Sequence, residues 1–266
     1  MTIARTAALL ATAALSCSTA RADVPEDPWQ AGEPRPFVAG VLDLGSSQAA
    51  MVAAGWGKPH FMWAGAVTRG WLTTDFAAVR PGVRVDLAAL GLEAGLRFGR
   101  SFKHLPMPEA DDHAALPERH GTTARMLDLS ASGGLPAGPG FAIYEVLGVK
   151  LLSRQGEVDV YDELLRIVYR PPWLATASVG WLASLRGGAL LAGGRAQWAF
   201  HTGRGGDPFL RAGPLVYWRA WPHVAIVGEL LYPLSKPDHL GFTDPIEAFL
   251  VFEITAATGV SPPRFP

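Results

Sequence analysis

The sequence predicts an all-β fold: a single antiparallel transmembrane β-barrel of about twelve strands, within a range of about ten to fourteen. Three observations support this. Hydrophobic residues make up 49% of the 266 residues and charged residues only 18%, against about 25% charge in ordinary soluble domains. Beyond the N-terminal segment, no apolar stretch is long enough for a transmembrane helix, since the uncharged run 171–185 ends at Arg186. Apolar residues instead recur at every second position, which is the period of a β-strand.

The first residues, MTIARTAALLATAALSCSTARA, have the pattern of a secretory signal peptide. Arg5 precedes an apolar stretch, and Ala20 and Ala22 are the small residues of a cleavage site after Ala22. The expected organisation has four parts: a signal peptide 1–22, a disordered segment 23–34, the barrel 35–258 and a tail 259–266.

Cys17 is the only cysteine and lies inside this signal peptide. The mature chain would have no thiol, which excludes disulfides, thiolate metal sites and cysteine catalysis. A lipoprotein signal that acylates Cys17 is the alternative, although such signals favour leucine three places before the cysteine and Leu15 is two places before it. Loss of two arginines with the signal changes the formal charge from −1 to −3. This near-neutral charge argues against a nucleic-acid partner.

The second half of the chain has the clearest alternation. Its five expected strands are 173–185, 189–201, 208–219, 223–232 and 246–255. In the first of them every second residue is apolar, from Trp173 to Leu185. The segments RGG (186–188) and GRGGD (203–207) between strands are typical of hairpin turns. Pro214 cannot donate to a strand ladder, which weakens the assignment of 208–219.

The two faces of these strands differ in chemistry. Aromatic residues lie toward the ends of the apolar faces, as in the girdles at the membrane interfaces. The predicted interface aromatics are Trp173, Trp181, Trp198, Phe200, Trp218 and Tyr232. The opposite faces carry charges that a barrel would enclose. The predicted lumen charges are Arg186, Arg195, Arg211, Arg219, Glu229, Glu247 and Glu253. We expect Arg195 and Arg211 to pair with Glu247 or Glu253, because unpaired charges in a narrow lumen are costly.

The first half is less regular. Residues 90–98 alternate, with Glu93 and Arg97 on the polar face, whereas Val83, Val85 and Leu87 have the opposite phase. A bulge or turn near Ala88 would reconcile the two. The other expected strands are 36–45, 48–56, 60–72, 74–80, 123–132, 140–152 and 158–169.

This assignment contains a conflict. It places an odd number of strands between the long polar segments 103–121 and 235–244, whereas the long loops of a membrane barrel share one side. Either one strand is wrongly assigned or one of these loops is periplasmic.

The signal peptide, the two-residue period, the abundant glycine and the aromatic belts together resemble bacterial outer-membrane β-barrel proteins over nearly the whole mature chain. The segments GWGKPHFMWAG and YRPPWLATASVGW are similar to those of uncharacterised barrel-like proteins from GC-rich proteobacteria. The resemblance implies residence in the outer membrane of a Gram-negative bacterium. The C-terminal GVSPPRFP departs from the family pattern, because Phe265 lies outside the alternation and the usual terminal aromatic of the last strand is missing.

Three groups of residues could carry chemistry. The segment 103–121 holds potential metal ligands, namely His104, Asp111, Asp112, His113 and His120. Their spacing matches no metal motif, so we expect a solvated loop with no metal and no cofactor.

Ser184, His201, His223 and Glu229 are the residue types of a hydrolase at a barrel rim, but no nucleophile signature accompanies them. Lys58 and His60 beside Phe61 and Trp63 are more typical of a turn between membrane anchors than of a ligand site.

The sequence therefore predicts a non-enzymatic outer-membrane barrel, either a surface protein or a narrow pore. Its expected partners are membrane lipids and, for a pore, a small solute in the lumen. The alternatives are a barrel-embedded lipid hydrolase and a soluble lipid-binding barrel of lipocalin type. In the soluble binder Trp181, Trp198 and Trp218 would point inward, whereas in the membrane barrel they would point outward.

Overall fold

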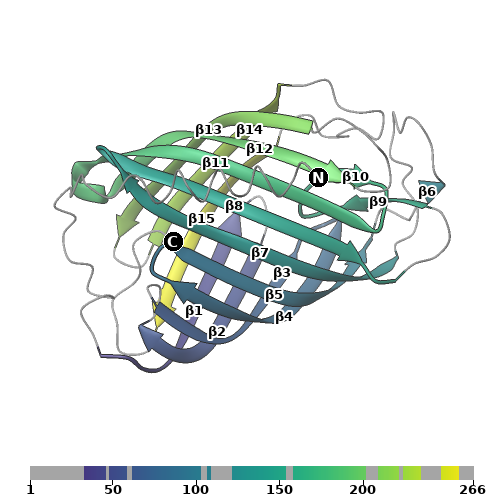
Figure 1. The fold of residues 1–266 in the computed structure, drawn as a ribbon, viewed down its shortest axis with the longest axis horizontal. Helices are drawn as coiled ribbons and strands as arrows, with labels where there is room; N and C mark the ends of the chain where they lie inside the picture. The colour runs from purple at the N-terminus through teal and green to yellow at the C-terminus, as the bar shows by residue number, and fades with distance from the viewer. Residues whose placement is uncertain are drawn as a thin grey trace, which may run out of the picture.

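The computed structural model describes most of the chain beyond its N-terminal segment (Figure 1). The described residues are 33–45, 48–58, 62–102, 107–108, 122–153, 158–201, 209–221, 224–234 and 247–257. The expected signal peptide, the ligand-rich part of 103–121 and the C-terminal tail lie outside them. No helix among the described residues is long and apolar enough to span a membrane.

Within these residues a closed antiparallel barrel of twelve strands forms the body of the protein (Figure 1). Each strand pairs with its neighbours in the chain, and the first strand pairs with the last, with Ala39 opposite Ala257 and Gly45 opposite Val251. The wall strands are β1 (Arg35–Gly45), β2 (Gln48–Lys58), β3 (Met62–Leu72), β4 (Phe76–Leu87), β5 (Leu90–Ser101), β7 (Thr123–Ala137), β8 (Gly140–Leu151), β11 (Trp173–Leu185), β12 (Leu190–His201), β13 (Phe209–Trp221), β14 (Val224–Pro233) and β15 (Glu247–Ala257). The prediction of a single antiparallel barrel of about twelve strands is confirmed.

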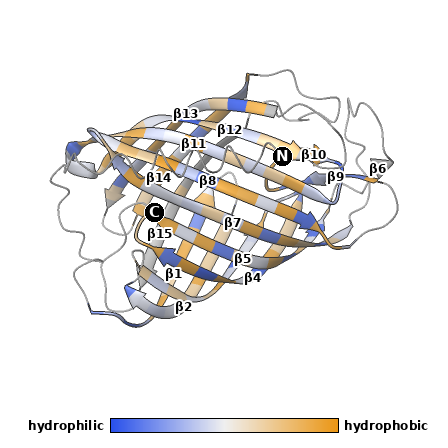
Figure 2. Cartoon of the chain, viewed as in Figure 1, coloured by the Kyte–Doolittle hydropathy of each residue, from blue (hydrophilic) through white to orange (hydrophobic). Residues whose placement is uncertain are grey.

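Hydropathy alternates along the strands of the wall (Figure 2), and the alternation of exposed and buried residues separates an outer from an inner face. In β5, for example, Leu96 and Phe98 are exposed while Glu93 and Arg97 are buried. The turn between β4 and β5 consists of Ala88, which has a positive φ of 50°, and Ala89. This turn accounts for the opposite phases of alternation before and after it. The expected strand 74–80 and the alternating residues Val83, Val85 and Leu87 therefore belong to one strand, β4.

The connections make the two ends of the barrel unequal. The four longest connections, 102–122, 152–172, 202–208 and 234–246, all join strands at one end, which we call the long-loop end. At the other end, the short-turn end, strands are joined by short segments such as Gly138–Pro139 and the single 3-10 turn η1 (Arg186–Gly188). β1 begins and β15 ends at the short-turn end.

The expected barrel strand 158–169 is wrong. This segment forms two short strands, β9 (Val158–Asp162) and β10 (Ile167–Tyr169), which pair with each other and with β6 (Met107–Pro108) but not with the wall. Without it, an even number of wall strands separates segments 103–121 and 235–244, so both belong to the long-loop end. The conflict in the sequence-based assignment therefore came from this one segment.

Apolar side chains form two clusters inside the barrel near the short-turn end. Phe37 and Trp63 pack edge to face with ring centroids 5.2 Å apart. Across the barrel, a second cluster is formed by Leu182, Leu191, Leu215, Tyr217 and Ala225. Arginines and acidic residues occupy the middle of the interior, and β9 and β10 lie at the long-loop end.

Close strand packing in this wall generates a first prediction. A Cβ atom at Gly193 would lie 1.9 Å from the carbonyl oxygen of Trp181 on the neighbouring strand β11, so Gly193→Ala must displace backbone. We expect it to destabilise the barrel by about 1–3 kcal/mol, measured by urea unfolding in detergent micelles. Gly99→Ala is the control, because its new Cβ would meet nothing closer than Ala78 Cβ at 3.9 Å. Equal stability of the two variants would contradict the close approach of β11 and β12 at Gly193.

Candidate functional site: the barrel lumen

The lumen at the long-loop end is occupied by a hairpin from the chain itself. Residues 158–169, which we call the plug hairpin, contain β9, β10 and the turn between them. Arg170 holds the base of the hairpin through an ion pair with the fully buried Asp159, at 2.8 Å between Nε and Oδ1. The hairpin therefore has an internal charge pair besides its backbone bonds.

Asp162 attaches the tip of the hairpin to one wall. Its carboxylate accepts two hydrogen bonds from Arg97 of β5, at 3.2 Å from Nη1 and 2.7 Å from Nη2. The same carboxylate accepts the backbone N–H groups of Leu164 and Leu165, which fixes the turn. Asp162 is only 1% exposed. A bidentate hydrogen bond between an arginine and a carboxylate is stronger than a hydrogen bond between neutral groups.

A second arginine holds the hairpin from the far side. Arg211 of β13 is 1% exposed, and its guanidinium donates to the backbone oxygen of Leu165 at 3.4 Å and to Oε1 of Gln197 at 2.7 Å. In the circular strand order, β5 and β13 are separated by four strands on one side and six on the other. The plug hairpin is therefore held from nearly opposite walls.

Apolar contacts seat the hairpin against the remaining wall. Val160, Ile167 and Tyr169 pack on inward-facing residues of β7, β8, β11 and β12, which are Met126, Val149, Leu151, Leu174 and Ala199. Burial, together with the negative charge of Asp162, raises the pKa of the Tyr169 phenol, so it stays neutral at physiological pH. A small cavity beside the hairpin is lined by Phe76, Ala78, Met126, Leu151 and Leu164 among others.

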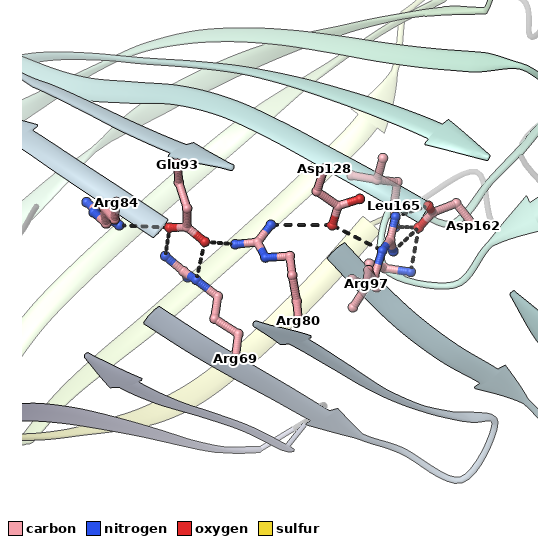
Figure 3. Close-up of polar contacts among 9 residues, drawn as sticks. Arg69, Arg80, Arg84, Glu93, Arg97, Asp128, Asp162 and Leu165 are labelled. Atoms are coloured by element: carbon pink, nitrogen blue, oxygen red, sulfur yellow. Dashed lines mark hydrogen bonds and ion pairs between the residues drawn. The ribbon is translucent and has the colours of Figure 1, made fainter. Parts of the chain in front are cut away.

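Charged side chains continue from the hairpin into the middle of the lumen (Figure 3). Along this chain of contacts, positive and negative groups alternate: Asp162, Arg97, Asp128, Arg80, Glu93 and Arg84. Arg69 adds a bidentate contact to Glu93, at 2.9 Å for the shorter bond, and Arg84 also contacts Asp86 at 3.0 Å. The four arginines thus face four acidic residues, and the cluster is neutral as a whole.

A second charge cluster lies on the other side of the lumen. Arg195 of β12 contacts Glu145 of β8 at 2.5 Å, Glu229 of β14 at 3.4 Å and Ser178 Oγ at 2.8 Å. Glu229 is buried, whereas the side chain of Glu145 is 42% exposed although its position faces inward. This cluster ties together strands β8, β11, β12 and β14.

The predicted lumen charges fall into three groups. Arg195, Arg211 and Glu229 are inside the barrel, and Arg219 is half-buried on the inward face of β13. Arg186 was wrongly predicted to be luminal: it is exposed in the turn η1, because β11 ends at Leu185. Glu247 and Glu253 are paired by backbone register with the inward-facing Leu231 and Ala225. Their side chains lie outside the described part, so their pairing with the arginines stays a prediction.

The predicted interface aromatics lie on the outer face. Trp181, Phe200, Trp218 and Tyr232 are exposed, and Trp173 and Trp198 are partly exposed on the same alternation. Trp181 donates its indole N–H to the backbone oxygen of Ala137 at 3.1 Å, which anchors it at the short-turn end. The inward tryptophan of the GKPHFMW segment is Trp63, which packs in the interior rather than at an interface.

The hydrolase residues do not form a described catalytic group. Glu229 contacts Arg195, Ser184 lies beside the short turn of β11, and the side chains of His201 and His223 are outside the described part. Among the described residues there is also no group of three or more His, Cys, Asp or Glu that could hold a metal ion.

Sequence reasoning did not identify most of the central charges. Arg80, Arg84 and Asp86 follow a period of two on β4 and could have been assigned to the inner face from that pattern. The partners of Asp162 and Glu145 could not be derived in this way, because the arginine that each contacts lies on a strand that is not its neighbour in the chain.

The attachment of the hairpin generates a second prediction. Asp162→Ala leaves Arg97 without its bidentate partner and removes the cap of the turn. We expect a loss of about 3–5 kcal/mol of unfolding free energy and faster hydrogen exchange across 158–169. Asp86→Asn is the control, because Asp86 contacts Arg84 and not the hairpin; the exchange of hairpin amides should stay slow in it. Slow hydrogen exchange of the hairpin amides in Asp162→Ala would contradict the conclusion that Asp162 attaches the hairpin to the wall.

Comparison with known proteins adds likeness of fold only. No family model and no curated protein matches the chain. Among solved structures, it is similar to the NanC porin (10% identity, 86% of this chain and 99% of that one, TM-score 0.36) and to the translocator domain of the autotransporter NalP from Neisseria meningitidis (14%, 98% and 96%, TM-score 0.39). It is also similar to OmpT, an outer membrane protein of Vibrio cholerae (8%, 89% and 100%, TM-score 0.38).

Proposed function

We propose that this protein is a non-enzymatic outer-membrane β-barrel of a Gram-negative bacterium, a surface protein whose lumen is closed by its own plug hairpin. The observation that carries the proposal is the hairpin 158–169, which is held inside the wall by Arg97 and Arg211. A barrel of twelve strands has room for a narrow passage, and this hairpin occupies it.

The outer surface supports a membrane location. Large apolar side chains on every part of the wall point away from the interior, including Trp56 at 60% and Val83 at 61% exposure. Such a continuous apolar surface is unfavourable in water but matches lipid. A soluble binder of lipocalin type would need the opposite arrangement, with Trp181, Trp198 and Trp218 inside, and these residues face outward.

Closure of the lumen favours a surface protein over an open pore. Apolar clusters line the interior at the short-turn end, and the plug hairpin occupies the long-loop end. The neutral charge cluster between them holds the strands together, because each buried charge has a partner.

A narrow gated pore is the second candidate. Glu145 favours it, since its inward-facing side chain is 42% exposed and solvent therefore reaches the middle of the lumen. In this alternative, the hairpin would have to leave its seat before a solute could pass.

Planar-bilayer conductance of the refolded chain tests closure. We expect the wild type to show no sustained open state and a variant in which a flexible linker replaces residues 158–169 to conduct ions. Asp162→Ala should give brief openings, because it weakens the attachment without removing the plug. Sustained conductance by the wild type would contradict a closed lumen, and silence of the linker variant would exclude the gated pore.

Membrane location has a separate test. After cell fractionation, the protein should remain in the detergent-extracted envelope, and its gel mobility should change on heating because a barrel of paired strands stays folded in mild detergent. Recovery of the protein as a soluble periplasmic species would overturn the proposed location.

A further inference from the structure

Three basic residues on adjacent strands face outward at the long-loop end. Arg100 is the next-to-last residue of β5, Arg125 the third residue of β7 and Lys150 the next-to-last residue of β8. The alternation fixes their direction: Arg125 lies opposite the exposed Phe98, and Lys150 lies between the buried Val149 and Leu151. We call these three residues with Trp173 the basic rim.

The register brings the basic rim together. Lys150 is directly opposite Trp173 of β11, and its Nζ lies 5.4 Å from the ring centroid. Arg125 is diagonal to Lys150, whose direct partner on β7 is Leu127, and also diagonal to Arg100, whose direct partner is Thr123. Diagonal neighbours in a sheet are about 7–8 Å apart, within reach of long side chains. The rim is therefore one continuous surface.

The charges of the rim are not neutralised by the described protein. No acidic partner of Arg100, Arg125 or Lys150 occurs among the described residues, in contrast to the paired arginines inside the lumen. Asp75, in the turn between β3 and β4 at this end, is engaged by the hydroxyl of Thr74 at 2.9 Å. Two of the three basic residues, Arg100 and Arg125, are exposed on the outer face.

The surface next to the rim has the chemistry of a lipid contact. Toward the middle of the barrel, the same three strands expose Leu96, Leu129 and Val146. The Trp173 ring lies over Gly148, where an added Cβ would be 3.8 Å from the ring. Cations at the strand ends lie at headgroup depth, where a charge on the lipid face costs little, and the apolar surface lies at acyl-chain depth.

We propose that the basic rim binds the phosphorylated headgroup of a glycolipid of the lipid A type, in the leaflet on the long-loop side. Arg100, Arg125 and Lys150 contact the phosphates, while Leu96, Leu129 and Val146 contact the acyl chains. The inference rests on the proposed membrane location. The short-turn end offers no equivalent surface among the described residues, because its cations that do not point into the lumen are separated: Lys58 is on β2, and Arg186 is in the turn between β11 and β12, which are not neighbours of β2.

The test measures binding of fluorescent bisphosphorylated lipid A to the refolded full chain in detergent micelles. The triple variant Arg100→Gln/Arg125→Gln/Lys150→Gln should weaken binding at least about tenfold, since each basic residue near a membrane surface contributes to attraction of anionic lipid. The matched control, Lys58→Gln/Arg186→Gln, should bind as the wild type does. Dephosphorylated lipid A should bind weakly, and inorganic phosphate should not displace the labelled lipid.

Several outcomes would overturn the inference. They are unchanged binding by the triple variant, equal loss in the control, equal binding of dephosphorylated lipid, and displacement by inorganic phosphate, which would mean a bare anion site. Insertion into phosphatidylcholine vesicles and heat-modifiable mobility are measured on the same preparations. A chain that inserts but does not bind lipid A refutes this inference alone, whereas a chain that fails to insert refutes the proposed function.

Discussion

Closure of the sheet is the constraint on which the rest of this structure depends. Backbone N–H and C=O groups in hydrocarbon must all be paired, and only a sheet without edges pairs them with strands. The register between β1 and β15, from Ala39–Ala257 to Gly45–Val251, removes the last two edges. Once the sheet is closed, each strand has one inner and one outer face. The two-residue period then decides which side chains point outward and which must find partners inside.

The side chains of an eight-stranded wall just fill its interior, and a wall of twelve strands encloses more space. Three groups of residues follow one another along the barrel axis. They are an apolar layer near the short-turn end, arginine–carboxylate clusters in the middle and the plug hairpin near the long-loop end. Asp162 links the last two, since it caps the hairpin turn and accepts from Arg97. The plug and the charge network are therefore one connected structure.

The same residue type has opposite roles on the two faces. Arg97 is buried and neutralised by Asp128 and Asp162, whereas Arg100, three residues along the strand, is exposed on the outer face. The parity of the position makes this difference, because an odd number of residues separates opposite faces of a strand. Inside, arginine stabilises the barrel through protein carboxylates. Outside, at the strand ends, Arg100 and Arg125 have no acidic partner among the described residues and form part of the proposed lipid site.

The sequence by itself determined the barrel, the outward direction of Trp181, Trp218 and Tyr232 and the inward direction of Arg195, Arg211 and Glu229, because alternation is a local property of a strand. It could not decide whether 158–169 belongs to the wall, since a short apolar segment has the same pattern in a wall strand and in a buried hairpin. It also misplaced Arg186, where the strand ends one residue earlier. The contacts of Asp162 with Arg97 and of Arg195 with Glu145 were decided only by the tertiary structure. They join residues 65 and 50 positions apart. The first contact runs from the plug hairpin to the wall, and the second spans β11, which lies between β8 and β12 in the wall.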